Sequence, residues 1–286
     1  MTRKRSYLVC ASQRSGSTLL CELLKDTGVA GRPEEYFEAT RETGAPPHPG
    51  EYLKDLPRTG AGIRDDLSQP AAPPHSSLQG LADYRQHIER TFRLGTTENG
   101  VFGAKLMWSQ LRELHSLAGE LPEYAGLDSF DLLQQLFDCP RYIRVIPQDK
   151  VRQAVSLWRA LQTRRWRLEH DPGDRQPAVL RYRFEGINHL VQAFHQEDRD
   201  WDGFFSARGV SPLSIVYEHE LDADLYRDRT VRKALGYIGV AAPAGWRVRE
   251  PIKRQADATS EEWVAKYHRD AVQRGGDQNA VGVAAI

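Results

Sequence analysis

The polar stretch at residues 12–18 is the part of the chain best suited to chemistry. It reads Ser-Gln-Arg-Ser-Gly-Ser-Thr, follows a short apolar run at residues 7–11 and leads into a segment with leucines at helical spacing, residues 17–26. Small residues between a strand and a helix let successive backbone N–H groups turn toward an anion, and the start of the helix adds a partial positive charge. The stretch therefore predicts a loop that binds phosphate or sulfate groups.

The residue types in this loop argue against a magnesium-bound triphosphate. A nucleoside triphosphatase loop reads G-x-x-x-x-G-K-[ST], whereas here Ala11 stands at the first glycine and Ser17 at the lysine. A guanidinium at position 14 can supply the lost positive charge as a planar fork. A serine-capped helix start without a ligand is the alternative, and the loop alone does not decide between them. The expected anion contacts are Gln13, Arg14, Ser15, Gly16, Ser17 and Thr18.

Two adjacent carboxylates and one strand lysine are candidate acid–base groups. Glu34 and Glu35 follow Pro33, and because adjacent side chains usually point apart, we expect one to face the site and the other solvent or a basic partner. Lys105 is the one charge in the apolar run 100–108, where an unpaired ammonium is costly, so it needs an anionic partner. The alternatives are two solvated acids at a helix start and a lysine that reaches solvent from a strand edge.

A local basic surface is predicted in the middle of the chain. Residues 141–167 carry eight basic side chains and one acid, Asp149, which favours an anion site, although solvated helix faces often carry such charge. Aromatic faces and planar polar groups suit sugars and polar rings, so Arg159, Gln162, Arg164 and Trp166 are candidate acceptor contacts. For Trp158, core packing is the favoured role.

The composition excludes several classes of protein. Lysines plus arginines equal aspartates plus glutamates at 39 each, so no net charge draws the chain to nucleic acid. No apolar stretch approaches the roughly 20 residues of a membrane span, which favours a soluble protein. Its three cysteines, at unrelated spacings, suit reduced thiols in the cytoplasm. The histidines lack ligand spacing, so no metal is expected.

Strands are expected to alternate with helices along the chain, which predicts an α/β domain with a parallel sheet. We expect a single domain over residues 1–286, with a proline- and glycine-rich surface excursion at 44–75 that could be an acceptor-site lid and a frayed tail at 271–286. The expected strands are residues 7–11, 100–108, 142–146 and 213–217, and the expected helices are 17–26, 81–94, 110–117, 129–137, 149–167, 181–206, 227–236 and 260–270.

Five segments, in this order, resemble the bacterial trehalose 2-sulfotransferase family: residues 12–20, 31–37, 102–108, 153–160 and 254–257. The resemblance covers about residues 7–270, and five ordered segments are more specific than any one of them. It implies a P-loop-like three-layer α/β fold with a mainly parallel central sheet flanked by helices. It also implies 3'-phosphoadenosine-5'-phosphosulfate (PAPS) as sulfuryl donor, its desulfated form PAP as product, a hydroxyl of a small acceptor as target, and a homodimer.

The resemblance also assigns residue roles. Residues 14–18 would hold the 5'-phosphosulfate, Ser156 the 3'-phosphate, and Glu35 would be the catalytic base, with Lys105 at the bridging oxygen of the donor. The expected C-terminal clamp on the nucleotide is Arg254, Gln255 and Ala256. The expected acceptor contacts are Glu35, Tyr36, Phe37, Trp108, Arg159, Gln162, Arg164 and Trp166.

The chain departs from the pattern at two positions. The family and its wider relatives usually carry an arginine for the 3'-phosphate where this chain has Pro147, so Arg144, Lys150 or Arg152 would have to supply that charge. Cytosolic sulfotransferases have a histidine where this chain has Met107, which cannot accept a proton. A P-loop small-molecule kinase and a non-catalytic nucleotide-binding protein are the alternative functions.

Overall fold

The computed structural model describes residues 5–37, 81–163, 180–248 and 258–283, and they fall into two compact units. A single domain over the whole chain stays a prediction. The predicted excursion at 44–75 lies outside the described residues. Unit 1 comprises Met1–Pro46, Ala71–Gln148 and Gln196–Ile252, and unit 2 comprises Pro47–Pro70, Asp149–His195 and Lys253–Ile286.

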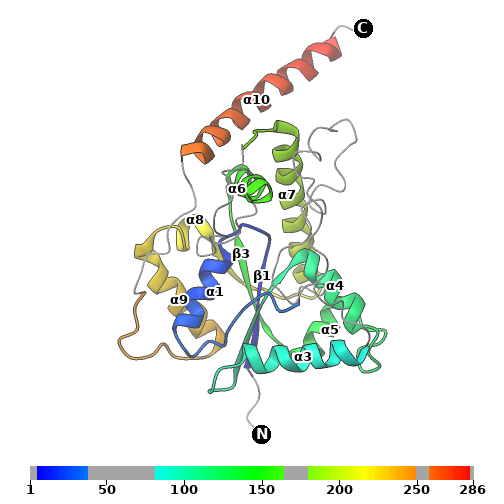
Figure 1. Cartoon of the computed structure of the whole chain (residues 1–286), viewed down its shortest axis with the longest axis vertical. Helices are drawn as coiled ribbons and strands as arrows, with labels where there is room; N and C mark the ends of the chain where they lie inside the picture. Colours follow the sequence, from blue (N-terminus) through cyan, green and yellow to red (C-terminus); the bar gives the residue numbers. More distant parts are fainter. Residues whose placement is uncertain (1–4, 38–80, 164–179, 249–257, 284–286) are drawn as a thin grey trace. The chain divides into compact units, whose positions relative to one another are not determined.

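Unit 1 is built on a parallel sheet of order β2-β1-β3-β4 (Figure 1). Each pairing between neighbouring strands is parallel, so the carboxyl ends of the strands meet at one edge of the sheet. That edge carries the polar stretch after β1 and the residues that follow the other strands. The prediction of an α/β fold with a parallel central sheet is confirmed. The strands are β1 (Arg5–Ala11), β2 (Val101–Met107), β3 (Arg141–Ile146) and β4 (Leu213–Val216).

Helices cover both faces of this sheet (Figure 1). Alternate residues of β1 point to opposite faces, since Tyr7 and Val9 join one core cluster while Leu8 and Cys10 join the other. The first cluster contains α1 (Ser17–Asp26) and α9 (Asp224–Ile238). The second contains α3 (Leu81–Gly95), α4 (Trp108–Ala118), α5 (Ser129–Leu136) and the unit 1 part of α7 (Phe184–Ser206).

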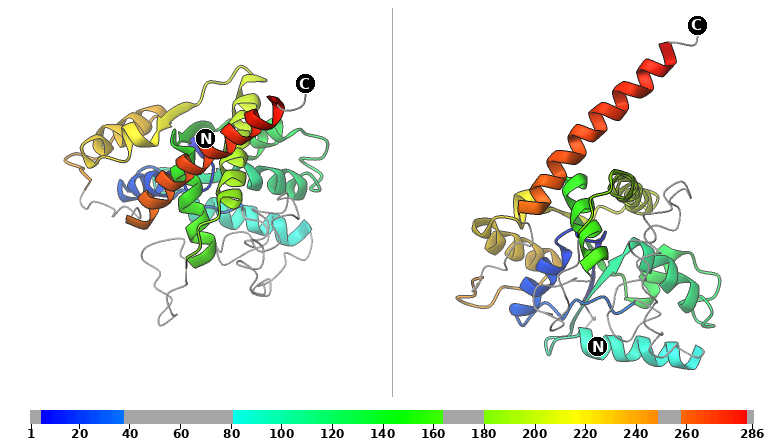
Figure 2. Two further views of the ribbon diagram at one scale, coloured as in Figure 1. Left: turned by 90° about the horizontal axis from the view of Figure 1, so that it is seen from above. Right: turned by 45° about the horizontal axis from the view of Figure 1, so that its top comes forward.

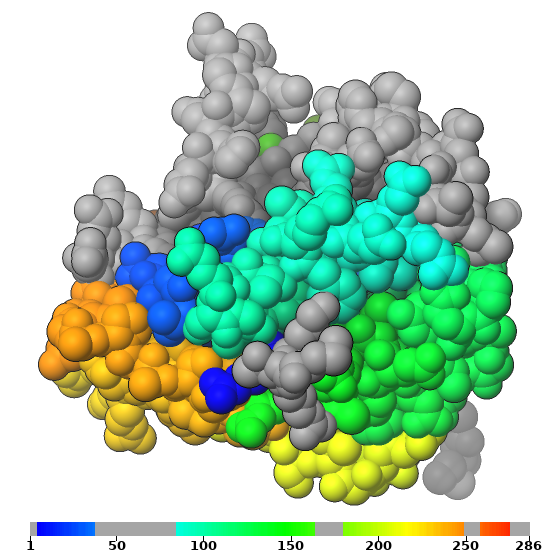
Figure 3. All heavy atoms as spheres, turned by 90° about the horizontal axis from the view of Figure 1, so that it is seen from below, coloured from blue at the N-terminus to red at the C-terminus, as the bar shows by residue number. Residues whose placement is uncertain are grey.

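The amino edge of the sheet is closed by contacts with the end of α9. Arg5 donates a hydrogen bond to the carbonyl of Gly239, and Arg141 donates to the carbonyl of Tyr237. Figure 3 views the molecule from below, where the start of β1, in dark blue, reaches the surface. The polar residues with candidate chemistry therefore lie at the opposite, carboxyl edge.

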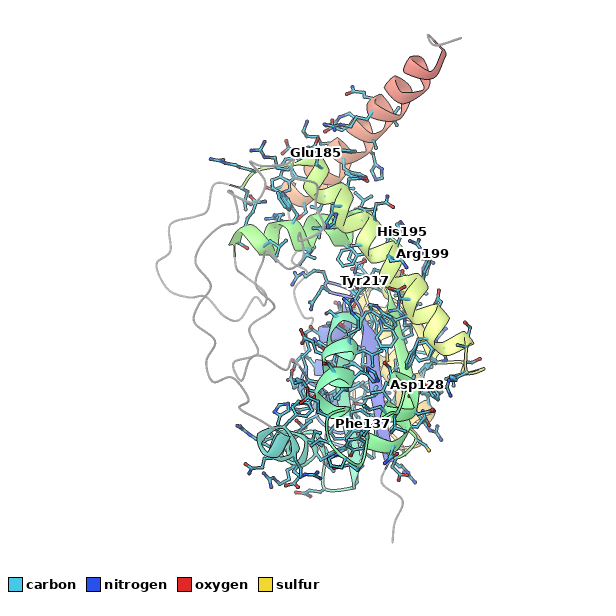
Figure 4. All side chains as sticks on the ribbon, turned by 90° about the vertical axis from the view of Figure 1, so that its right-hand side faces the viewer. Asp128, Phe137, Glu185, His195, Arg199 and Tyr217 are labelled. Carbon is cyan, nitrogen blue, oxygen red and sulfur yellow. The ribbon has the colours of Figure 1, made fainter. Side chains whose placement is uncertain are left out.

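Local sequence accounts for the helix boundaries. Asp128 caps α5 by accepting hydrogen bonds from the N–H groups of Phe130 and Asp131, both at 2.9 Å, and Figure 4 labels Asp128 and Phe137 at the two ends of this helix. The helix α1 ends at Asp26, with Thr27 as its C-cap, and Gly28 then takes the left-handed conformation expected of it, with φ 68°. The strand expected at residues 213–217 ends one residue earlier, at Val216. The short helix α8 (Tyr217–Glu220) begins directly after it and was not predicted from the sequence.

Unit 2 consists of α6 (Lys150–Thr163), the first part of α7 and α10 (Ala258–Val283). Its core is centred on Trp158, which is fully buried, so the favoured packing role is confirmed. The first half of α10 packs on α6 (Figure 2). This helix continues to Val283, and a frayed tail over residues 271–286 stays a prediction.

Candidate active site

The loop between β1 and α1 is a tight turn. Arg14 and Gly16 both have left-handed backbone angles, with φ 60° and 82°, which reverse the chain between the strand and the helix. Gly16 is the residue before α1, so no side chain caps this helix, and its first turn contains no acid. The hydroxyl of Ser15 donates to that of Ser17 at 3.1 Å. A helix start of this kind leaves backbone donors available for an anion.

Gly16 is required at its position because the ring of Tyr217 lies against it. A Cβ atom at position 16 would overlap with that ring, and the positive φ adds strain for any other residue. Tyr217, labelled in Figure 4, is the first residue of α8, directly after β4, and its hydroxyl lies 3.2 Å from a carboxylate oxygen of Asp222. One wall of the turn is therefore an aromatic ring that follows β4, the last strand in the sheet order.

Lys105 and Glu35 form an ion pair beside this turn. The Nζ of Lys105 lies 2.6 Å from Oε1 of Glu35 and donates to the hydroxyl of Thr18 at 2.9 Å. The side chain of Lys105 is only 2% exposed, against 24% for Glu35. The prediction that Lys105 needs an anionic partner is confirmed, and the alternative of a lysine reaching solvent is wrong.

The second oxygen of Glu35 is held by the helix that follows β2. Gln110, in the first turn of α4, donates from its amide to Oε2 of Glu35 at 2.8 Å. Its carbonyl oxygen accepts from the backbone N–H of Met107 at 3.0 Å and so caps the helix. Met107 is itself buried. Its thioether side chain contributes no proton acceptor to the site.

The neighbouring carboxylate, Glu34, points to a different partner. It forms an ion pair with Lys25 near the end of α1, and Lys25 also bonds Glu22 at 2.7 Å. The carbonyl of Glu34 accepts from the backbone N–H of Lys105 at 2.9 Å, which attaches the segment to the edge of β2. The two acids therefore point apart, as predicted, and only Glu35 faces Lys105.

A second buried ion pair lies on the opposite side of β1. Arg144 of β3 is 1% exposed and its Nη2 lies 2.6 Å from Oδ1 of Asp198 on α7. The guanidinium also lies 5.8 Å from the centre of the Trp201 ring. The indole N–H of Trp201 in turn donates to the carbonyl of Ala11 at 3.3 Å, where the loop begins. Arg144, predicted to bind the 3'-phosphate, thus has an internal carboxylate partner in unit 1.

The candidate residues of unit 2 bond one another within that unit. Arg152 forms ion pairs with Asp149, at 3.3 Å, and with Glu261, while Arg159 donates to the hydroxyl of Ser260. Gln162 bonds the backbone of Arg181. Their ligand roles, and that of Ser156, stay predictions. Arg164, Trp166, Arg254, Gln255 and Ala256 lie outside the described residues.

The three aromatic candidates of unit 1 differ in exposure. Phe37 is fully buried and its ring makes T-shaped contacts with Phe137 and His87, and its role as an acceptor contact stays a prediction. Tyr36 and Trp108 are partly exposed. Tyr36 donates to the carbonyl of Arg32 at 2.6 Å, and burial raises the pKa of its phenol to about 12.

Sequence reasoning missed three residues that shape this region: Gln110, Trp201 and Tyr217. The place of Gln110 in the first turn of a helix was a usable signal, because glutamine at that position often bonds the backbone at the helix start. Trp201 lies within α7 and Tyr217 begins α8, both far from the loop in the sequence, and no local pattern indicated their contacts with it.

Neither a metal cluster nor a membrane span occurs in the part of the chain that the structure describes. No group of three or more His, Cys, Asp or Glu side chains could hold a metal ion there. No helix among these residues is both long and apolar enough to cross a bilayer.

Comparison with known proteins identifies relatives of this chain. The Stf0 sulphotransferase family model matches residues 6–270. A trehalose 2-sulfotransferase of Mycobacterium tuberculosis is 35% identical over 290 residues, covering 95% of this chain and 97% of that protein. A trehalose 2-sulfotransferase of Mycolicibacterium smegmatis is 36% identical over 276 residues, covering 94% and 97%. The crystal structure of the sulfotransferase STF9 from Mycobacterium avium is 15% identical, with a TM-score of 0.39, and covers 93% of this chain and 68% of that one.

Proposed function

Because the chain belongs to the Stf0 sulphotransferase family and is a sulfotransferase, we propose that it uses PAPS to sulfate a hydroxyl of a small acceptor, with Glu35 as general base. The observation that carries this proposal is the carboxylate of Glu35, held between Lys105 and Gln110 beside the turn at residues 12–18. The acceptor class that we propose is a trehalose-like sugar, since both curated relatives are named trehalose 2-sulfotransferases.

The turn after β1 fits the sulfated end of the donor. It offers the uncapped start of α1, the hydroxyls of Ser15, Ser17 and Thr18, and the guanidinium of Arg14. A phosphosulfate needs no bridging metal, which agrees with the lack of the lysine that a nucleoside triphosphatase carries in this loop. When bound there, PAPS would supply the activated sulfuryl group.

Glu35 has the chemistry that the acceptor side of the reaction needs. An acceptor hydroxyl is a weak nucleophile, and a positioned carboxylate that takes its proton as the new O–S bond forms makes it a stronger one. The ammonium of Lys105 lies against the Glu35 carboxylate and favours its ionised form.

Lys105 has a second role in this proposal. As the S–O bond to the donor breaks, the electron pair stays on the leaving phosphate, and an ammonium nearby stabilises that negative charge. Lys105 already contacts Thr18 in the first turn of α1, so its charge lies beside the proposed donor loop. The contributions of Ser156, Arg152 and residues 254–256 to nucleotide binding, a homodimer and a cytoplasmic location stay predictions.

The Glu35→Gln variant tests the proposal. Glutamine keeps the shape of the side chain but cannot accept the proton, so turnover with PAPS and trehalose should fall by about 10²–10⁴-fold. Binding of PAP without Mg²⁺, measured by calorimetry, should stay within about threefold of the original chain, because the loop is unchanged. Unchanged turnover would reject Glu35 as the base, and failure to bind PAP without Mg²⁺ in the original chain would reject the donor.

A further inference from the structure

Gln110 is almost fully buried and both ends of its amide are engaged. It is 2% exposed, although glutamine is a residue type that is usually at the surface. Its Oε1 accepts from the Met107 N–H at 3.0 Å and its Nε2 donates to Oε2 of Glu35 at 2.8 Å. A buried amide is retained at such a cost only when its donor and acceptor are both satisfied.

These two partners fix the orientation of the amide. The backbone N–H of Met107 is a donor only, so it must face the carbonyl oxygen of Gln110. An ionised carboxylate is an acceptor only, so it must face the NH₂ group. A flipped amide would set two donors against each other and two acceptors against each other. Gln110 is therefore a rigid link between the start of α4 and the carboxylate of Glu35.

The carboxylate of Glu35 is held at both of its oxygens. Lys105 bonds Oε1 from β2 and Gln110 bonds Oε2 from α4, so the carboxylate plane cannot rotate without breaking one of these contacts. Rotation matters because a base must point its free lone pair at the proton that it takes, and small misplacements in an active site cost large factors in rate.

We propose that Gln110 is a positioning residue for sulfuryl transfer, which orients the Glu35 carboxylate and favours its ionised form. This inference rests on the proposed role of Glu35 as general base. A hydrogen bond donated to the charged form of a carboxyl lowers its pKa, so removing the donor raises the pH at which Glu35 becomes able to accept a proton.

Other charged groups also act on Glu35, but Gln110 can be changed without altering them. Lys105 contacts it from β2, Cys21 of α1 lies near enough to interact with it, and Glu34, which pairs with Lys25, precedes it in the chain. Burial raises the pKa of the Cys21 thiol to about 12, so this group stays neutral at working pH. Gln110 is neutral, and its replacement by methionine removes both hydrogen bonds of the amide while every one of these charges remains.

The test is the pH dependence of kcat/KM for the full chain with PAPS and trehalose. In Gln110→Met, the acidic limb of the profile should move to higher pH by about one unit, and the rate on the plateau should fall by about 10-fold. In Gln110→Glu, an oxygen remains for the Met107 N–H, so the helix cap is kept, but a like charge now faces Glu35. The limb should therefore move further than in Gln110→Met.

Asp128→Ala is the matched control, because it removes the cap of α5 in the same unit without any contact to Glu35. It should lower the melting temperature and leave the acidic limb in place. PAP affinity, measured in all variants, should stay within about threefold of the original chain if the loop is intact.

Two outcomes separate this inference from the proposed function. If Glu35→Gln abolishes the acidic limb while both Gln110 variants leave it at its original pH, Gln110 serves only as a helix cap and the inference is overturned. If the limb persists unchanged in Glu35→Gln, the group that titrates is not Glu35, and the proposed base itself is rejected.

Discussion

Two buried ion pairs flank the central strand β1, and they are nearly identical in geometry. Lys105 pairs with Glu35 on one side and Arg144 pairs with Asp198 on the other, each at 2.6 Å. In each pair the cation is buried, at 2% and 1% exposed, and the carboxylate is partly exposed, at 24% and 20%. The surroundings differ: Lys105 contacts Thr18 of the turn at residues 12–18, whereas Arg144 lies against the ring of Trp201.

We propose that the two ion pairs have different roles: one takes part in the reaction, and the other supports the loop. An ammonium is a compact point charge with rotatable donors, whereas a guanidinium is a planar fork that suits a fixed carboxylate partner. Lys105 accordingly contacts both Glu35 and Thr18, while Arg144 pairs with Asp198. We assign the lysine pair to the chemistry and the arginine pair to the support of the loop through Trp201 and Ala11.

After Glu35→Gln, the largest expected effect comes from Lys105→Met. Removing the ammonium should lower turnover by about 10²–10³-fold, the usual loss for one donor at a developing charge. Glu35 is partly exposed and keeps Gln110 as a donor, so the melting temperature should change little. Turnover is measured at saturating trehalose and PAPS. A loss of less than about threefold would place Lys105 outside the reaction.

Asp198→Asn should lower the free energy of unfolding and leave turnover nearly unchanged. It leaves the charge of Arg144 buried without a carboxylate, and breaking a buried pair in this way costs about 3 kcal/mol. Glu35→Gln should cost less, because Lys105 keeps the Thr18 hydroxyl as a hydrogen-bond acceptor. Urea unfolding of both variants measures the comparison. If the free energy of unfolding falls equally in the two variants, the stability of such a pair does not depend on whether its cation is a lysine or an arginine.

Gly16→Ala tests the loop that lies between the two pairs. The new methyl group would overlap with the Tyr217 ring and would adopt a positive φ, which by itself costs roughly 1–2 kcal/mol. PAP affinity should fall. Adding Tyr217→Ala should restore part of the stability, since the overlap disappears while the backbone strain remains. If the double variant is no more stable than Gly16→Ala, the ring does not constrain the turn.

The smallest expected effect concerns two buried thiols, Cys10 near Arg144 and Cys21 near Lys105. Arg144 acts on Cys10 and Lys105 on Cys21, yet burial raises the pKa of both, that of Cys21 from 9.0 to about 12. Above pH 9 the unfolded chain loses these protons while the folded chain keeps them, so stability is complete below pH 9 and falls as the pH rises toward 12. The free energy of unfolding should fall by about 1 kcal/mol per thiol between pH 9 and pH 10, and the fall should be smaller in Cys21→Ala. An identical fall in that variant would contradict the assignment.

The sequence predicted most strands and helices because their periodic patterns are local. The boundaries of α1 follow from its leucine spacing and from Gly28, and the opposed directions of Glu34 and Glu35 follow from their adjacency. The contacts of Trp201 and Tyr217 with the loop could not be predicted, because they depend on how distant strands pair.

Arg144 illustrates a second limit of the sequence. A basic residue on a strand near the expected nucleotide indicated a phosphate contact, but the sequence held no signal that Asp198, more than fifty residues later, would pair with it. Charge spacing along one strand predicts where a cation lies in the sheet, and the packing of a helix from another part of the chain decides what it bonds.

The measurement that tests the assignment of Glu35 most directly is kcat/KM for trehalose as a function of pH in the original chain and in Glu35→Gln, at saturating PAPS. Our account predicts an acidic limb in the original chain that disappears in the variant, where the residual rate is flat across the same range. An acidic limb of equal position and steepness in both proteins would show that another group takes the proton.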